Sequence, residues 1–216
     1  MSTSAELRRR ARYTLGNSLF SSTFLYAILA YIIVSAITGA SVYTVVGFFI
    51  VSGPMMVGLA YYFLRMVRRG GQTVEIGELF VGFKQGMSNN VVTFLLKMLY
   101  IYLWSLLLFI PGIVKSYSYA MTDYILADHP EYTATQAINE SRRMMDGNKM
   151  RLFMLDLSFI GWFVVGCLTF GIGFAWVMPY MMTAKTHFYE EISGEIYIDD
   201  ILNGMDFDEQ NEAKSI

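Results

Sequence analysis

Long apolar runs separated by clusters of charge are the feature that most limits how this chain can fold. Charged residues make up only 16% of the 216 residues, whereas 55% are apolar and the mean hydropathy is +0.42. A soluble domain usually has about 25% charged residues, spread over its surface. Apolar runs of about 20 residues match the thickness of the hydrocarbon core of a bilayer. The pattern therefore predicts an integral membrane protein.

Six apolar runs are candidate membrane spans. Backbone amides need partners inside lipid, and the runs lack the period-two alternation of barrel strands, so each is predicted to be a helix. The run at 112–126 is short, and it is predicted either to span or to be re-entrant. The predicted fold is an all-α polytopic transmembrane helical bundle that forms one domain at residues 1–193. The spans lie at about 19–37, 42–64, 91–110, 112–126, 152–168 and 172–189.

The first run follows a basic arm, so a cleaved signal peptide is an alternative to a span. It extends from Leu19 to Ile37, which is longer than the roughly 7–15 residues of a signal-peptide apolar region. Further apolar runs follow it, so we interpret it as an uncleaved span. The one cysteine, Cys167, has no second thiol for an intrachain disulfide and is interpreted as a small packing residue.

Basic residues predict the topology. The connections at 38–41, 111–112 and 169–171 contain no Lys or Arg, whereas the N-terminal arm and the segments 65–84 and 142–151 are basic. With six spans, every basic connection falls on the same side of the membrane. The positive-inside rule makes that side cytoplasmic. We therefore expect a multi-pass plasma membrane protein with both termini in the cytoplasm.

Each pair of spans is preceded by a short amphipathic stretch that ends at a glycine: Gly16, Gly86 or Gly147. Apolar spacing of i, i+3, i+4 and i+7 predicts one helical face. Such a helix can lie in the headgroup plane and end in a left-handed glycine cap. A threefold helix-plus-hairpin repeat is one interpretation, and three unrelated juxtamembrane helices are the other. The faces consist of Leu7, Ala11 and Leu15; Ile76, Leu79, Phe80 and Phe83; and Ala134, Ala137, Ile138, Ser141 and Met145.

Motifs in the second half of the chain resemble a known family. They are Ile110-Pro111-Gly112-Ile113, Tyr117-Ser118-Tyr119, Ser141-Arg142-Arg143-Met144-Met145, Gly147, Lys149, Arg151, Phe153, Leu157-Ser158-Phe159-Ile160-Gly161-Trp162, Pro179-Tyr180 and Phe188-Tyr189. Together they resemble the bacterial integral membrane family named domain of unknown function 975. That family is distantly similar to the membrane domain of some glycerophosphodiester phosphodiesterases.

The resemblance covers about 1–195, and its specific part is 110–190. The first unit departs from the pattern, because Ser18 stands where an aromatic residue is expected after Gly16-Asn17. The resemblance implies a six-helix plasma membrane protein of the Gram-positive type. It transfers no catalytic residue to this chain.

Four ionisable residues inside the predicted spans are the candidate polar cluster: Lys97, Asp123, Asp156 and Lys185. Each such group costs roughly 2.5–3.5 kcal/mol at a helix centre. In the predicted topology the four lie at similar depth near the inner leaflet, so opposite charges are expected to pair. A polar cavity that opens to the cytoplasm is the functional interpretation, and structural pairing is the alternative.

Basic and acidic segments outside the spans suggest partners. Arg142, Arg143, Lys149 and Arg151 are candidate contacts for lipid headgroups, since basic residues are attracted to anionic membrane surfaces. A role as a topology signal alone is the alternative. The acidic tail, 194–216, is expected to be disordered and cytoplasmic. It could dock a membrane or cytoplasmic protein partner.

Motifs for enzymes are missing from the sequence. It has no P-loop, no zincin motif, no paired cysteines for a metal and no Gly-x-Ser-x-Gly elbow. We therefore expect a protein that is not an enzyme, has no cofactor and does not bind nucleic acid. The expected function is to bind or move an amphipathic molecule, a lipid or a hydrophobic peptide, with anionic membrane lipids as partners. A scaffold or accessory subunit of another membrane complex is the alternative, and an intramembrane enzyme is the least favoured.

Overall fold

The computed structural model describes residues 2–15, 21–41, 45–107, 109–169, 171 and 173–213. Predictions for Gly16-Asn17, for 19–20 and 42–44 at the starts of two spans, and for 108, 170, 172 and 214–216 lie outside these residues. All elements in the described ranges are helical, which confirms the all-α class. They are α1 (Ser4–Leu15), α2 (Ser22–Ser41), α3 (Val45–Arg68), η1 (Ile76–Phe80), α4 (Val81–Lys84), α5 (Met87–Leu107), α6 (Phe109–Ser118), α7 (Thr122–Asp128), α8 (Ala134–Met144), α9 (Lys149–Leu157), α10 (Ile160–Leu168) and α11 (Phe174–Ala213).

Three helical segments are long and apolar enough to cross a membrane. They are Ser22–Ala40 in α2, Gly47–Arg68 in α3, and Lys149–Leu168, which covers α9 and α10. A stretch of this length and hydropathy is typical of a transmembrane helix. The transmembrane class is therefore supported, while the number of six spans stays a prediction.

The run at 112–126 is divided between two short helices. α6 ends at Ser118 and α7 begins at Thr122, with a turn between them. α6 packs back against α5, and Pro111 lies in its first turn. A proline is tolerated there because a first-turn amide has no partner within the helix. The segment is thus bent inside the protein instead of forming one straight helix.

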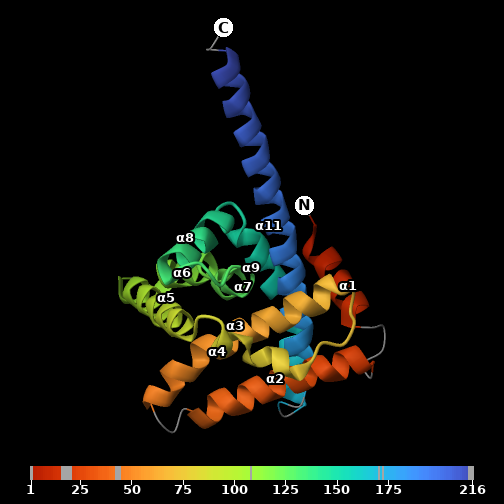
Figure 1. The fold of residues 1–216 in the computed structure, drawn as a ribbon. Helices are drawn as coiled ribbons and strands as arrows, with labels where there is room; N and C mark the ends of the chain where they lie inside the picture. Colours follow the sequence, from red (N-terminus) through yellow and green to blue (C-terminus); the bar gives the residue numbers. More distant parts are fainter. Residues whose placement is uncertain are drawn as a thin grey trace.

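α11 is the longest helix and passes through the whole molecule (Figure 1). It contacts α1, α2 and α3, and its C-terminal part projects beyond the other helices (Figure 1). The acidic tail was predicted to be disordered, but its backbone is helical as far as Ala213. After Pro179 this helix contains no proline, so its backbone hydrogen bonds can continue without a break.

α3 lies between two apolar clusters that form the core. One cluster joins α3 to α7, α8, α9 and α11, and the other joins it to α2 and η1. Phe63, Leu64 and Met66 of α3 are at most 1% exposed. α7 is nearly enclosed, since five of its seven residues are buried. This packing fixes the positions of helices that carry the charged residues.

The amphipathic stretches have the predicted apolar faces, but these faces pack inside the protein. Leu7, Ala11 and Leu15 of α1 are buried, and α1 lies along α11. The second stretch begins as the short 3₁₀ helix η1, in which Leu79 is fully buried while Phe80 is 37% exposed. α1 therefore does not turn its apolar face toward lipid headgroups.

α8 follows the same rule, because its apolar face packs against α5 and α7. Ala134, Ala137, Ile138, Ser141 and Met145 are all buried, as the spacing predicted. Two of the three glycine caps are described: Gly86 has φ +65° and Gly147 has φ +75°. Positive φ is what a left-handed helix cap requires. The cap prediction is therefore confirmed at these two positions.

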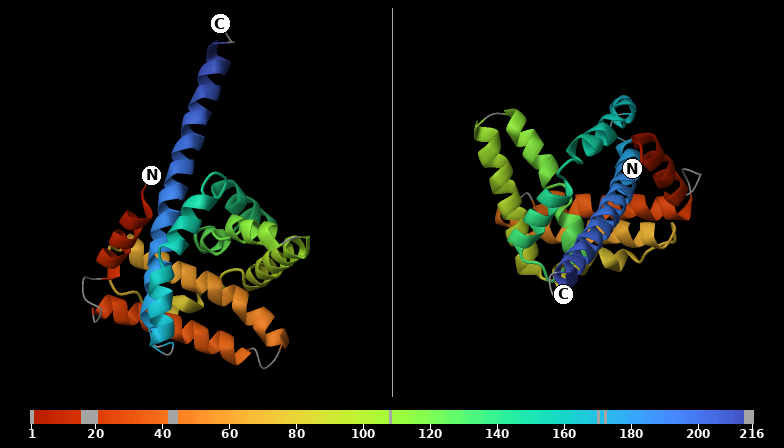
Figure 2. Two further views of the ribbon diagram at one scale, coloured as in Figure 1. Left: turned by 180° about the vertical axis from the view of Figure 1, so that it is seen from behind. Right: turned by 90° about the horizontal axis from the view of Figure 1, so that it is seen from above.

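Two helical arms extend from the body: the α5–α6 hairpin and the α9–α10 segment (Figure 2). Both arms expose large apolar side chains to the surroundings. A soluble monomer seldom exposes so continuous an apolar surface, whereas lipid accommodates it. The most exposed of these side chains are Tyr102, Leu106 and Ile110 on one arm, and Met150, Ile160 and Leu168 on the other.

Candidate functional site: a layer of charged pairs

Lys97 and Asp123 form an ion pair between α5 and α7. The Lys97 ammonium donates to both carboxylate oxygens of Asp123, at 2.7 and 2.6 Å. Their side chains are 14% and 20% exposed, so both charges are partly removed from solvent. Charges in such surroundings need a close opposite partner to offset their loss of hydration. This pair supplies it.

Asp156 and Lys185 form a second pair, between α9 and α11. The Lys185 Nζ lies 2.9 Å from Asp156 Oδ1 and donates to Oδ2 at 3.3 Å. The Tyr117 hydroxyl of α6 also donates to Oδ2, at 3.2 Å. The Tyr117 ring packs edge-on against Phe153 of α9. Three helices thus meet at this carboxylate, and the four predicted charges form two pairs.

Both ammonium groups keep hydrogen-bonding capacity. A lysine ammonium has three donors, and its carboxylate partner leaves at least one of them free for another acceptor. The Lys185 and Asp156 side chains are 23% and 24% exposed. The second pair can therefore be approached by a polar group from outside. Chemically, the arrangement suits a zwitterionic or anionic headgroup.

A separate group of charges ties the ends of α3 and α7 to the middle of α11. Arg68 binds both oxygens of Asp128 at 2.7 Å and donates to Glu190 at 2.8 Å. The Tyr189 hydroxyl donates to Asp128 at 3.0 Å. Bidentate arginine–carboxylate contacts hold two groups in a fixed orientation. We call Arg68, Asp128, Tyr189 and Glu190 the Arg68 cluster.

One residue of each charged pair lies five residues before a member of the Arg68 cluster on the same helix. Asp123 precedes Asp128 by five residues, and Lys185 precedes Glu190 by five residues. Five residues of α-helix span about 7.5 Å along the axis. Asp123 and Lys185 therefore lie at similar distances from the Arg68 cluster along their own helices, while the common depth expected from the sequence stays a prediction. Because the pairing joins α5, α7, α9 and α11, it also fixes the register of these helices.

The four predicted headgroup contacts are divided between two helices. On α8, Arg143 pairs with Glu140 at 2.9 Å, and Arg142 donates to the Asn139 side chain at 3.4 Å. Lys149 of α9 lies 3.5 Å from Asp146. Arg151 is directed toward α11, where it binds Glu191 at 2.6 Å. The set is therefore engaged by neighbouring side chains in separate places.

Glu191 is a junction between the N-terminus, α9 and α11. Burial raises the pKa of its carboxyl group, but hydrogen bonds from the Ser2 backbone and from Arg151 outweigh this effect, so the pKa is below its ordinary value. The backbone N of Ser2 lies 2.6 Å from Glu191 Oε1. This carboxylate stays ionised near neutral pH and holds Arg151 in place. Arg151 is thus a structural residue in this arrangement.

Within the described ranges, no set of three His, Cys, Asp or Glu side chains could hold a metal ion.

Part of the chain that includes this region matches a known protein family. Residues 106–195 match the family model described as protein of unknown function (DUF975). This match supports the assignment of residues 106–195 to that family. The DUF975 region holds α6 to α10 and the first half of α11, and with them Asp123, Asp156 and Lys185. The family resemblance predicted from the motifs is thereby confirmed for this part of the chain. Comparison with curated proteins and with solved structures found no match.

The sequence reasoning missed two parts of the site. Tyr117 was noted as part of a family motif, and no contact with Asp156 was predicted for it. The Arg68 cluster was missed because Arg68 was interpreted as a topology signal and no role was predicted for Asp128. A signal did exist, since opposite charges stood at the ends of predicted spans on the same side of the membrane.

Proposed function

We propose that this protein is a non-enzymatic integral membrane protein that binds or moves an amphipathic molecule, a lipid or a hydrophobic peptide, at the inner leaflet. Its polar part would reach the layer of charged pairs, and its apolar part would lie along the exposed arms. The observation that carries the proposal is the partly exposed Asp156–Lys185 pair, whose Asp156 lies on the arm that exposes Ile160 and Val164.

The physical reason is that a charged group and an exposed apolar surface lie next to each other on α9. Asp156 lies on α9, next to the exposed apolar side chains of Phe153, Met154 and Leu157. A molecule with one charged end and one apolar end can satisfy both surfaces at once. A purely polar ligand would leave the apolar arm uncovered, and a purely apolar one would leave the spare donors of Lys185 unused.

Native mass spectrometry of the purified protein tests the proposal. We expect the wild-type protein to retain lipid or peptide after detergent exchange, and we expect Lys185→Gln to retain severalfold less. Glu131→Gln is the matched control, because Glu131 is an exposed carboxylate that pairs only with His129 in the described structure. Wild-type spectra free of any bound amphiphile would contradict the proposal.

A scaffold function is the second candidate, and α11 favours it. Its C-terminal part extends past the other helices (Figure 1) and carries the acidic residues of the tail. A projecting acidic helix offers a surface to another protein. Crosslinking in cells from a residue near Ala213 should then trap one partner in stoichiometric amount. A protein that acts alone would give no such product.

A further inference from the structure

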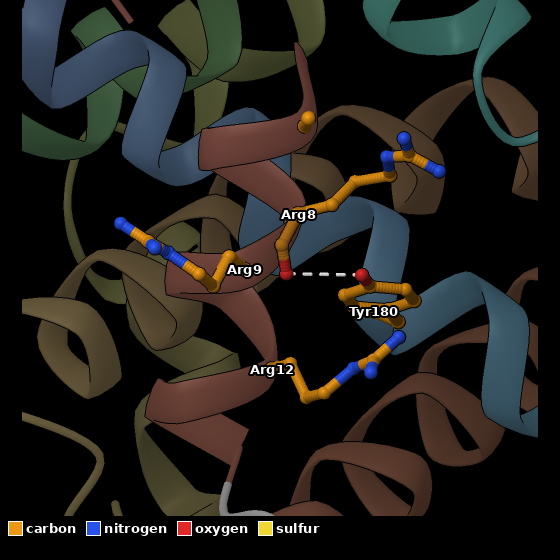
Figure 3. Close-up of a pocket in the computed structure, with 5 residues that line it drawn as sticks. Arg8, Arg9, Arg12 and Tyr180 are labelled. Carbon is orange, nitrogen blue, oxygen red and sulfur yellow. Dashed lines mark hydrogen bonds between the residues drawn. The ribbon is translucent and has the colours of Figure 1, made fainter. Parts of the chain in front are cut away.

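α1 carries an arginine-rich stripe beside its buried apolar face. Ala5, Arg8, Arg9 and Arg12 follow the spacing i, i+3, i+4 and i+7, which places them along one side of the helix. Together with Tyr180 of α11 they line a cavity of about 260 Å³ (Figure 3). We call it the α1 cavity. Three of its five lining residues are arginines.

Tyr180 fixes the position of this cavity. Its hydroxyl donates to the backbone oxygen of Arg8 at 2.9 Å, and its ring packs edge-on against Phe159 and Trp162. In Figure 3 the side chains of Arg8 and Arg12 lie on either side of the Tyr180 ring, whereas Arg9 extends away from it. Arg8 and Arg12 are thus held about one helical turn apart with an aromatic ring between them.

The charge of the α1 cavity is not compensated. Within the described part of the chain, Arg8, Arg9 and Arg12 form no ion pair. The Arg8 guanidinium donates to the Ser158 backbone oxygen at 3.3 Å, and its Nε is shielded from solvent and has no hydrogen-bond partner there. By contrast, Arg10 on the same helix pairs with Glu6 at 2.9 Å. Buried donors are normally satisfied, so an unpartnered one points to an absent acceptor.

We propose that the α1 cavity binds the phosphate of an anionic phospholipid through Arg8 and Arg12. This proposal goes beyond the proposed function, because it places an amphipathic ligand at residues other than the Asp156–Lys185 pair. The guanidinium group is planar and presents paired donors that match phosphate oxygens. The neighbouring aromatic and apolar surface explains why a lipid is favoured over a soluble phosphate. Trp162 contacts Tyr180 and is 42% exposed, and Ile160 is 59% exposed.

The acyl chains would continue along α10, which leaves the cavity at Trp162. Only 22% of the apolar stretch in the Lys149–Leu168 segment is buried. Most of its apolar surface is therefore not covered by other described parts of the chain. A phospholipid would place its phosphate on the two arginines and its two acyl chains on the apolar helix. One ligand would therefore satisfy both surfaces. General attraction of basic residues to the membrane would need only positive charge, which Arg10 also supplies.

The experiment compares arginines of α1 that differ in position and share their charge. Full-length protein in detergent is titrated with short-chain phosphatidylglycerol, and binding is measured by native mass spectrometry. We expect Arg12→Gln to weaken binding about tenfold to a hundredfold, which is the effect of losing one charged hydrogen bond. Arg10→Gln is the control and should bind as the wild type does. Arg12 and Arg10 are both exposed, so neither change should unfold the protein.

Two further ligands distinguish binding of a phospholipid from binding of an uncharged lipid and from binding of free phosphate. Diacylglycerol of the same chain length should bind more weakly than phosphatidylglycerol, and inorganic phosphate alone should not compete at equal concentration. Equal competition by inorganic phosphate would overturn the lipid assignment. Equal losses in Arg10→Gln and Arg12→Gln would reduce the effect to net charge and overturn the proposal.

Failure of this proposal and failure of the proposed function give different results. If Arg8→Gln/Arg12→Gln binds lipid as tightly as the wild type, the α1 cavity is not the site, while lipid binding elsewhere still supports the proposed function. If the wild type binds none of the amphiphiles, both proposals fall. An unchanged thermal unfolding midpoint in each variant confirms that binding, and not folding, was altered.

Discussion

At the residue scale, the charges inside the helices are held to different degrees. Asp123 faces one ammonium that contacts both of its oxygens, whereas Asp156 is shared between Lys185 and Tyr117. Arg68 has two carboxylate partners on two helices. A charge with several partners loses only part of its stabilisation when one partner is removed. The Lys97–Asp123 pair is therefore the most sensitive to a single change.

Removing one member of that pair should destabilise the protein more than removing both. Lys97→Ala leaves Asp123 as a partly buried charge without its lysine, at a cost on the order of 3 kcal/mol. Lys97→Ala/Asp123→Ala leaves no stranded charge. Thermal unfolding in detergent should thus give the lowest midpoint for the single variants. Additive losses in the double variant would show that the two side chains are not coupled.

At the element scale, α3 packs against η1 and α4 through backbone contacts. A Cβ at Gly58 would overlap the carbonyl oxygen of Leu79, and a Cβ at Gly82 would overlap that of Pro54. α3 and the η1–α4 segment approach each other closely because Gly58 and Gly82, at the two contacts, have no side chain. This approach buries Leu79 completely and anchors the segment that leads into α5. The position of Lys97 on α5 depends on this anchor.

Gly58→Ala should therefore destabilise the protein, although alanine favours helix formation. The added methyl group meets backbone and can fit only if α3 and η1 separate, which costs about 1–3 kcal/mol. Gly77→Ala is the control on η1, because no atom lies within 4 Å of a Cβ there. Melting of both variants in the same detergent checks this. An unchanged midpoint for Gly58→Ala would mean that the contact is loose.

At the scale of the whole molecule, the charged connections gather at one end of the helices. The Arg68 cluster joins the ends of α3 and α7 to the middle of α11, and the Arg151–Glu191 pair joins the start of α9 to the same part of α11. This gathering is what the topology prediction requires, since every basic connection was expected on one side. The compartment that this end faces is still a prediction of the positive-inside rule.

Reporter fusions should place this end in the cytoplasm. Fusions at Gly70 and Gly147, in the charged connections, are expected to report an intracellular position. Fusions at Gly39 and Gly171, in the uncharged turns, are expected to report the opposite side. An intracellular signal at Gly39 or Gly171 would contradict the six-span topology, and the inner-leaflet position of the charged pairs would be lost with it.

The sequence by itself determined the helical membrane class, the amphipathic faces and the family of residues 106–195. Apolar run length, helical spacing and the motifs around Pro111 and Ser141 are local properties, so they can be read without coordinates. The need for pairing among Lys97, Asp123, Asp156 and Lys185 also followed locally, because each charge is costly in an apolar helix.

The tertiary structure alone decided which charges pair and where the apolar faces turn. Lys97 could have met Asp156 as well as Asp123 as far as the sequence is concerned, and only the packing of α5 beside α7 and α8 selected Asp123. The turn between α6 and α7 brought Tyr117 to Asp156, and α1 docked on α11 to form the α1 cavity. These outcomes depend on contacts between residues that are distant along the chain, and local patterns carry no record of such contacts.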